Sequence, residues 1–248
     1  MKYLNITACS KTGCVRSNNE DMVLVGNKFI RSDAYRNHFS ITPSGRYIMA
    51  VADGMGGHEA GEVASSSTLI DLQYFFYDLP KGLDISGYQE SMVGWLDSIN
   101  RKLHSKGLAN RAILDMGTTL VALAYYEGHL FRMHCGDSRL YLFRDGELKQ
   151  LTVDHSLNTI MGEEKHSNII TNCIGAGCKT SFMEICDIGD EVKAGDILLL
   201  CSDGLNDMVS DKTIAQMLAR GDEAEELAQA AVDAGGFDNV STCVIKVE

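Results

Sequence analysis

Four aspartates stand beside glycine or asparagine at the ends of predicted strands. They are found in Asp53-Gly54, Gly136-Asp137, Asp203-Gly204 and Asp238-Asn239. A neighbouring glycine lets the backbone bend sharply and leaves its carbonyl oxygen accessible, so that main chain and side chain can both ligate a hard cation. One Asp-Gly pair is an ordinary turn, but a set of them at the ends of core strands predicts a shared rim of the sheets.

A polar segment, residues 13–21, lies between two predicted strands and contains Arg16 and Glu20. The planar guanidinium of arginine matches the geometry of a phosphate group and binds it with paired hydrogen bonds. Taken alone, the segment fits two interpretations about equally well. Arg16 is either a phosphate ligand or the partner of Glu20 in a surface ion pair.

The net charge limits the partners that the chain can bind. It has 22 basic and 34 acidic residues, a formal charge of -12. Such a surface repels the phosphates of nucleic acids and anionic lipids, so we expect neither a nucleic acid nor a membrane as partner. Clustered carboxylates lose their mutual repulsion when a divalent cation sits between them, which agrees with the aspartate pattern.

Length and composition indicate one globular domain, residues 1–248. Hydrophobic residues make up 45% and charged residues 23% of the chain, and no linker-like tract divides it. No segment is apolar and long enough for a membrane span or a signal peptide. The 8 cysteines are too sparse for a disulfide scaffold. We therefore expect a cytoplasmic monomer with reduced, mostly buried thiols.

The elements that must position these residues are short strands and four helices. The strands are predicted at 4–10, 22–25, 47–52, 118–125, 129–134, 139–143, 197–200 and 242–247, and the helices at 59–77, 89–110, 211–219 and 224–234. In the second helix the stripe Met92, Trp95, Leu96, Ile99 and Leu103 predicts a core-facing side.

Turn residues and the grouping of the strands predict the fold class. Glu127-Gly128 and Asp145-Gly146 have hairpin turn chemistry and predict an antiparallel meander over residues 120–151. Strands grouped between helices predict an α+β domain in which sheet packs on sheet with helices outside.

Several common catalytic and binding motifs are absent from the sequence. No cysteine is followed by arginine at the spacing of a cysteine phosphatase, and there is no phosphate-binding P-loop or zinc-peptidase motif. The calcium-loop spacing is also missing, which disfavours a divalent-ion buffer.

Six motifs occur in the order found in the metal-dependent protein phosphatase 2C family. They are Arg16-x-x-x-Glu20-Asp21, Asp53-Gly54-Met55-Gly56-Gly57-His58, Gly117-Thr118-Thr119, Gly136-Asp137-Ser138-Arg139, Ser202-Asp203-Gly204-x-x-Asp207, and Asp238-Asn239 with Thr242. The chain resembles the bacterial Ser/Thr phosphatase branch over almost its whole length. The resemblance implies a β-sandwich of two antiparallel sheets flanked by helices on both sides, a four-layer αββα arrangement. It also implies a binuclear manganese or magnesium centre.

The resemblance implies roles for the residues that match these motifs. Asp53 would bridge two metal ions. Asp203 and Asp238 would complete one metal site, and Glu20 with the Gly54 carbonyl would complete the other.

Further roles follow from the same resemblance. Asp137, together with Asp203, would hold a third and weaker metal ion, and Arg16 would clamp the substrate phosphate. The residues expected to support these ligands and their waters are Asp21, Asp207 and Asn239.

Two histidines and one segment leave alternatives open. His58 is either the acid that protonates the leaving group or a residue packed at a helix start. His155 is expected to order a turn. Residues 157–165 are fewer than the flap that bacterial relatives usually carry there.

The function that the resemblance implies is hydrolysis of phosphoserine and phosphothreonine by a metal-bridging water. The substrates would be phosphoproteins, including a bacterial Ser/Thr kinase or its targets. The alternative is a catalytically silent relative that binds phosphoproteins or partner proteins. The intact set Arg16, Glu20, Asp53, Asp203 and Asp238 disfavours that alternative, because a silent relative has no chemical reason to keep all five.

Overall fold

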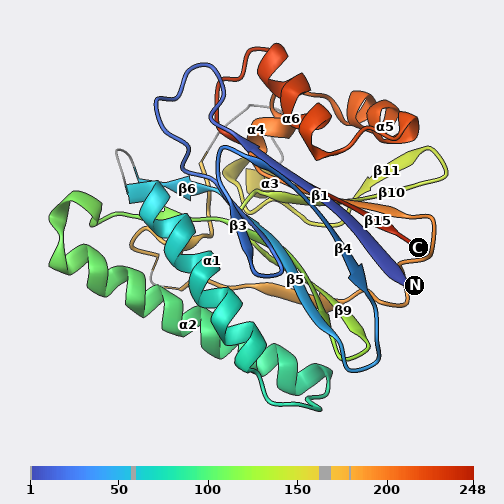
Figure 1. Ribbon diagram of the computed structural model, residues 1–248. Coiled ribbons are helices and arrows are strands. Elements are labelled where there is room, and N and C mark those ends of the chain that lie inside the picture. The colour runs from blue at the N-terminus through green and yellow to red at the C-terminus, as the bar shows by residue number, and fades with distance from the viewer. Residues whose placement is uncertain (1, 57–59, 162–168, 179) are drawn as a thin grey trace.

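The computed structural model describes residues 2–56, 60–161, 169–178 and 180–248. Two six-stranded antiparallel sheets lie face to face, and helices cover the outer face of each (Figure 1). The predicted αββα arrangement is confirmed. Among the residues described, no helix has the length and apolar content needed to cross a bilayer.

The first sheet has the strand order β11-β10-β14-β15-β1-β4. Its strands are β1 (Tyr3–Lys11), β4 (Ala34–Ser40), β10 (Arg139–Arg144), β11 (Glu147–Gln150), β14 (Ile197–Cys201) and β15 (Val240–Val247). The first and last strands of the chain are neighbours, with Leu4 opposite Val247, so both termini lie at one end of the sandwich (Figure 1).

The second sheet has the strand order β13-β9-β8-β5-β2-β3. Its strands are β2 (Met22–Val25), β3 (Lys28–Ile30), β5 (Arg46–Ala52), β8 (Leu120–Tyr126), β9 (His129–Cys135) and β13 (Glu184–Asp187). The two sheets bury a continuous apolar layer between them, which includes Met49, Leu123, Leu200 and Ile245.

Helices form the two outer layers. They are α1 (Ala60–Asp78), α2 (Ile85–Ala109), η1 (Arg111–Ile113), α3 (Leu157–Met161), α4 (Asp203–Asn206), α5 (Asp211–Arg220) and α6 (Ala224–Asp233). The long helices α1 and α2 pack on the second sheet, and α4, α5 and α6 pack on the first. The predicted core stripe of α2 is buried, and Trp95 Nε1 donates to Asp71 Oδ1 at 2.9 Å.

The predicted single meander over residues 120–151 is wrong. The β8–β9 hairpin belongs to the second sheet, whereas the β10–β11 hairpin belongs to the first. Both hairpin turns have the expected positive φ angles. The chain crosses between the sheets directly after β9, at Gly136, which has φ 118° and where a Cβ atom would contact the Thr119 side chain. This crossing places Asp137 between the two sheets' ends.

A third, small sheet links the sandwich to the outer helices. It consists of β6 (Gly54–Met55), β7 (Gly117–Thr118) and β12 (Ile174–Gly175) in the order β12-β7-β6. The start of α1 lies directly against β6. A Cβ atom at Gly61 would lie 2.6 Å from the Gly54 carbonyl carbon and 2.7 Å from Glu20 Oε2, so only glycine permits this approach.

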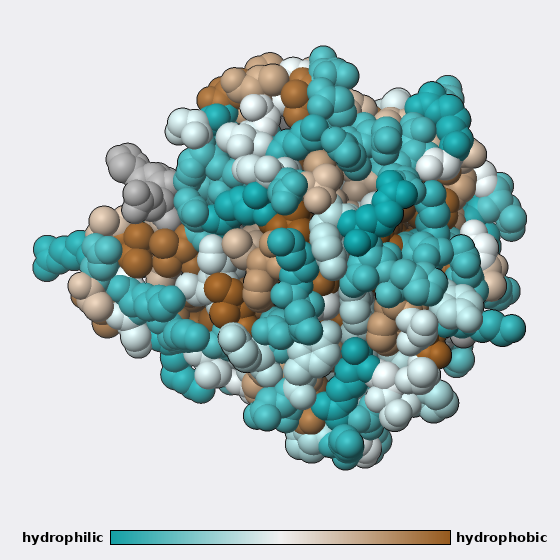
Figure 2. Space-filling model, in the orientation of Figure 1, coloured by the Kyte–Doolittle hydropathy of each residue, from teal (hydrophilic) through white to brown (hydrophobic). Residues whose placement is uncertain are grey.

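The face of the molecule in Figure 2 is mostly hydrophilic, and hydrophobic residues are exposed there in small separate areas. This agrees with the 23% of charged residues in the composition.

Candidate metal centre

A cleft of about 610 Å³ brings the predicted metal ligands of several distant motifs together. Its lining includes Glu20, Asp53, Gly54, Asp203 and Asp238, and Arg16 stands at the same cleft. Asp53 directly follows β5, Gly54 begins β6 and Asp203 begins α4. Arg16 and Glu20 precede β2, and Asp238 precedes β15. Three of the four predicted aspartates, Asp53, Asp203 and Asp238, therefore share one rim with carboxylates from both sheets, whereas Asp137 is not among the lining residues and is linked to the rim by its electrostatic interaction with Asp203.

Asp53 is held by backbone and hydroxyl contacts from the Gly117-Thr118-Thr119 motif. Thr118 Oγ1 donates to the Asp53 carbonyl at 2.8 Å, and the Thr119 N–H donates to the same oxygen at 2.9 Å. The Asp53 N–H donates to Thr119 Oγ1 at 3.1 Å. The turn after β5 is thereby fixed, and the adjacent Gly54 pairs directly with Thr118 across the small sheet.

Asp203 and Asp238 meet because β14 and β15 are neighbouring strands. Asp203 is the first residue of α4, immediately after β14, and Asp238 lies just before β15. A Cβ atom at Gly204 would collide with the Asn239 carbonyl oxygen. The glycine in this motif is therefore required for the close approach of the two loops.

Asn239 fixes the segment that carries Glu20 against the start of β15. Its Oδ1 accepts the Glu20 N–H at 2.8 Å. Its Nδ2 donates to the carbonyls of Thr12 at 2.8 Å and Asn18 at 2.9 Å. Every polar atom of this buried amide is used, so its contribution to the site is positional.

Asp21 is fully buried beneath the cleft and contacts the segment next to Asp203. Ser202 Oγ donates to Asp21 Oδ2 at 2.7 Å, and the Ser241 N–H donates to Ser202 Oγ at 2.9 Å. Burial raises the pKa of Asp21 to about 7. Asp207 lies one helical turn after Asp203, and its N–H donates to the Asp203 carbonyl at 2.9 Å.

The carboxylates of the cleft repel one another strongly. Burial raises the pKa of Asp53 well above its ordinary value, and the charges of Asp21, Asp203 and Asp137 add to that rise. Burial and then the charges of Asp207 and Asp238 raise the pKa of Asp203 to about 6. The pKa of Asp137 rises to about 7, again by burial first and the Asp203 charge second.

The donor set fits a divalent cation. Among the residues that the structure describes, three buried carboxylate oxygens have no hydrogen-bond partner: Asp21 Oδ1, Asp137 Oδ1 and Asp203 Oδ1. Buried polar atoms are almost always paired, so this group of unpaired oxygens needs a specific explanation. A hard cation between the carboxylates would neutralise their repulsion, and oxygen ligands suit magnesium and manganese.

Arg16 pairs with Asp238, so the alternative of an Arg16–Glu20 surface pair is wrong. Arg16 Nη2 donates to Asp238 Oδ2 at 2.6 Å, and 56% of the Arg16 side chain is exposed. The hydrogen bond and the charge of Asp238 raise the pKa of Arg16, which keeps it cationic. The guanidinium therefore stands at the entrance of the carboxylate cleft, where a phosphate can reach it.

Asp137 is held in place from both sides of its loop. The hydroxyl groups of Thr119 and Ser138 form a hydrogen bond of 2.7 Å with each other. The backbone N–H of Gly136 donates to the ring nitrogen Nδ1 of His155 at 3.1 Å, and the backbone N–H of His155 donates to the Gly136 carbonyl at 2.8 Å. His155 thus orders the turn before Asp137, as predicted.

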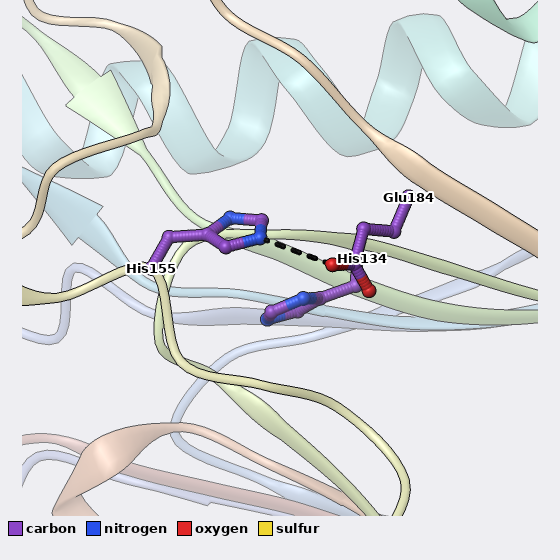
Figure 3. A group of neighbouring side chains, drawn as sticks. All are labelled: His134, His155 and Glu184. Atoms are coloured by element: carbon purple, nitrogen blue, oxygen red, sulfur yellow. Dashed lines mark ion pairs between the residues drawn. The ribbon is translucent and has the colours of Figure 1, made fainter. Parts of the chain in front are cut away.

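His155 also belongs to a group with His134 and Glu184 whose ligand atoms lie within 4.8 Å of one another (Figure 3). Because Nδ1 of His155 accepts the Gly136 N–H, its proton is on Nε2, which faces Glu184 Oε1 at 3.7 Å. A metal ion at Nε2 would have to displace that proton. Burial lowers the pKa of both histidines. The two imidazoles are therefore neutral, and Nε2 of His155 is not placed to bind a metal ion.

Two predictions, on His58 and on the flap at residues 157–165, concern segments that the structure describes only in part or not at all. His58 lies outside the described residues. The short flap begins with α3, and Ser156 and Ile170 form an isolated bridge across its base.

The sequence predicts Asp21 and Asn239 as supporting residues, but it does not single out the hydroxyl groups that hold the ligand-bearing turns in place. Thr118, Thr119, Ser138 and Ser202 were recognised only as parts of motifs. Their position close to the acidic residues could have identified them, because a hydroxyl group there can form a hydrogen bond with the backbone of the neighbouring turn.

Comparison with known proteins agrees with the fold and shows the family of the chain. The sequence profile of the family described as Protein phosphatase 2C matches residues 26–233. The chain is 36% identical to the serine/threonine protein phosphatase PstP of Mycobacterium tuberculosis over 98% of its own length, but it spans only 45% of that relative. It is 35% identical to the protein phosphatase PhpP of Streptococcus pneumoniae, covering 90% of this chain and 94% of PhpP. The chain belongs to the protein phosphatase 2C family.

Solved structures of bacterial phosphatases have the same fold. The Streptococcus agalactiae serine/threonine phosphatase superimposes with a TM-score of 0.82 at 29% identity, covering 99% of this chain and 100% of that chain. The catalytic domain of PstP in complex with 2 manganese ions gives a TM-score of 0.75 at 32% identity, and covers 100% of both chains.

Proposed function

We propose that this protein is a metal-dependent phosphoprotein phosphatase that hydrolyses phosphoserine and phosphothreonine. The observation that carries the proposal is the cleft in which Asp53, Asp203 and Asp238 lie together with Arg16. A carboxylate cluster with unpaired buried oxygens favours the binding of cations, and a guanidinium beside it favours the binding of an anion. A phosphate ester is the substrate that satisfies both.

The metal ligands are proposed as follows. Asp53 would be a ligand shared by two manganese or magnesium ions, Asp203 and Asp238 would complete one site, and Glu20 with the Gly54 carbonyl would complete the other. Support comes from the oxygen-only donor set and from the two manganese ions in the PstP structure. Asp137 and Asp203 would together hold a third and weaker ion. The charge of Asp203 raises the pKa of Asp137, as expected for two carboxylates that lie close together.

The bound ions would supply an acidified water as nucleophile and would neutralise charge on the phosphoryl oxygens. The chain itself does three things. Arg16 binds and orients the phosphate. Asp21 and Asn239 hold the ligand-bearing segments in place through Ser202 and Glu20. Asp207 adds negative charge next to Asp203, where it can accept a hydrogen bond from a bound water.

The cellular setting is part of the proposal. The chain acts as a single domain and a monomer in the cytoplasm, on phosphoproteins made by a bacterial Ser/Thr kinase or on the kinase itself. The names of the relatives, which are bacterial protein phosphatases, support phosphoproteins as substrates. His58 is proposed as the acid for the leaving alkoxide, because it follows the Asp53 motif closely in sequence.

One assay tests the proposal directly. A phosphothreonine peptide is incubated with the chelator-treated protein after addition of manganese, magnesium, calcium or no metal, and released phosphate is measured. Manganese and magnesium should support turnover, whereas calcium should support little, because its looser coordination acidifies water less. Full turnover after exhaustive chelation would contradict the mechanism. Metal binding without turnover on any phosphopeptide would favour the silent regulatory module.

A further inference from the structure

Two cysteines outside the metal centre lie in position to react with each other. Cys173 Sγ and Cys178 Sγ are 3.3 Å apart, and both are free thiols. The sulfurs would need to approach only to about 2.05 Å to form a disulfide. The spacing is Cys-x4-Cys, so this proximity comes from the fold of the loop and not from a known redox motif.

The loop that joins the two cysteines is tightly wound. Gly175, Ala176 and Gly177 all have positive φ angles, of 83°, 50° and 70°. The Cys178 N–H donates to the Gly175 carbonyl at 2.9 Å, and this turn brings Cys178 back over Cys173. An alanine with positive φ is strained, so the surrounding contacts must hold this conformation.

Those contacts come from α2 and from the segment before β7. The Gly175 N–H donates to Asn100 Oδ1 at 2.8 Å, and the Ala176 N–H donates to the Met116 carbonyl at 2.7 Å. Ser181 Oγ donates to the Cys173 carbonyl at 2.6 Å. The cysteines are therefore held near each other by the native structure.

The two thiols differ in access to solvent. Cys178 is half-buried and lines an open groove of about 680 Å³ beside α2, together with Asn100 and His104. Cys173 is only 4% exposed, and burial raises its pKa to about 12. A small oxidant would thus meet Cys178 first, and Cys173 would be the thiol that resolves the oxidised product.

The dithiol loop is connected to the proposed metal centre through the small sheet. Ile174, the residue after Cys173, lies opposite Thr118 on β7. Thr118 in turn lies opposite Gly54 on β6 and donates to the Asp53 carbonyl. Only one strand separates the loop from the Asp53–Gly54 segment, so a shift of β12 acts on the backbone that carries both ligands.

We propose that Cys173 and Cys178 form a reversible disulfide, and that its formation lowers turnover by displacing β12 and, through β7, the Asp53–Gly54 segment. The effect on turnover rests on the proposed phosphatase function, whereas the disulfide itself does not.

A peroxide serves as the oxidant. The Cys178 thiolate attacks one peroxide oxygen and breaks the O–O bond, which gives a sulfenic acid and a hydroxide ion that takes up the proton lost by the Cys178 thiol. The Cys173 sulfur then attacks the Cys178 sulfur, its proton passes to the departing hydroxide as water, and the S–O bond breaks as the S–S bond forms. Two thiols lose two protons and two electrons, and the peroxide becomes two waters. A dithiol reductant reverses the bond by exchange.

Peptide mapping tests the site independently of activity. Cys173 and Cys178 fall within one tryptic peptide, residues 166–179. After mild treatment of the manganese-loaded protein with hydrogen peroxide, this peptide should lose two hydrogens and resist thiol alkylation, and a dithiol should restore both labels. The exposed Cys186 serves as internal control. Alkylation of both loop thiols under conditions that oxidise Cys186 would overturn the site.

Kinetics test the coupling. Oxidation should lower kcat on a phosphothreonine peptide about tenfold, since displacement of catalytic groups on the 1 Å scale can cost up to about 10²-fold. Cys178→Ser should keep its activity after the same treatment, and Cys186→Ser should behave like the wild type. A mapped disulfide with unchanged kcat would overturn the coupling. A reduced protein without any activity would count against the phosphatase function, while the mapping would still decide the disulfide.

Discussion

At the scale of single residues, Asp203 combines three properties that define the proposed centre. It lies beside Asp53, its Oδ1 has no hydrogen-bond partner among the described residues, and burial together with the charges of Asp207 and Asp238 raises its pKa to about 6. We predict that Asp203→Asn lowers turnover by about 10²-fold or more, the scale on which loss of one electrostatic stabiliser acts. Folding should suffer little, because the amide conserves shape. The exposed turn residue Asp190 provides a control, since Asp190→Asn should leave kcat unchanged.

Arg16 should act on substrate binding more than on the chemical step. It is largely exposed and pairs with Asp238, and phosphate binding would draw the guanidinium away from that carboxylate. Arg16→Ala should raise KM about tenfold, as expected for a hydrogen bond between charged groups, with a smaller change in kcat. Arg16→Lys should recover part of the loss, because it restores charge without the planar fork. A large drop in kcat at unchanged KM would argue against phosphate binding by Arg16.

At the scale of elements, the sequence predicted the buried strands and missed those at the edges. Apolar runs such as residues 47–52 and 197–200 identify central strands. In β4, exposed residues alternate with half-buried ones along the sheet edge, and no apolar run marks the strand. The meander failed because hairpin turns determine local pairing but not which sheet a hairpin joins. The meeting of β14 with β15 and the approach of Cys173 to Cys178 depend on tertiary packing, which spacing alone does not encode.

The glycines that bring α1 to β6 offer a test of that packing. Gly61 and Gly94 both lie in helices, where alanine is intrinsically favoured by about 1 kcal/mol. A Cβ atom at Gly61 would meet Gly54 and Glu20, whereas one at Gly94 would meet no described atom within 4 Å apart from its own stretch of helix. Gly61→Ala should therefore lose metal-dependent turnover and thermal stability, and Gly94→Ala should be neutral or slightly stabilising. Equal melting temperatures and activities in the two variants would contradict the packing described.

At the scale of the whole molecule, the acidic cleft should make stability depend on pH and on metal. The folded pKa of Asp21 and Asp137 is about 7 against the ordinary 3.8, so the metal-free folded state holds protons that the unfolded chain releases. The contribution of these two carboxyl groups to the stability of the folded state should be greatest below about pH 4 and should fall as the pH rises toward 7. Manganese at neutral pH should raise the melting temperature in proportion to the logarithm of its concentration. A metal-free melting temperature that rises from pH 5 to pH 7 would contradict the raised pKa values.

The most direct test of the proposed centre is the number of manganese ions bound by wild type and Asp53→Asn, measured by calorimetric titration of chelator-treated protein at neutral pH. Asp53 is the ligand proposed to be shared by both ions, and it lies at the middle of the repelling carboxylates. The wild type should bind two ions tightly, and the variant should lose tight binding of both, because the asparagine removes the bridging charge. Two ions bound by Asp53→Asn with unchanged affinity would show that the metal centre is not built around Asp53.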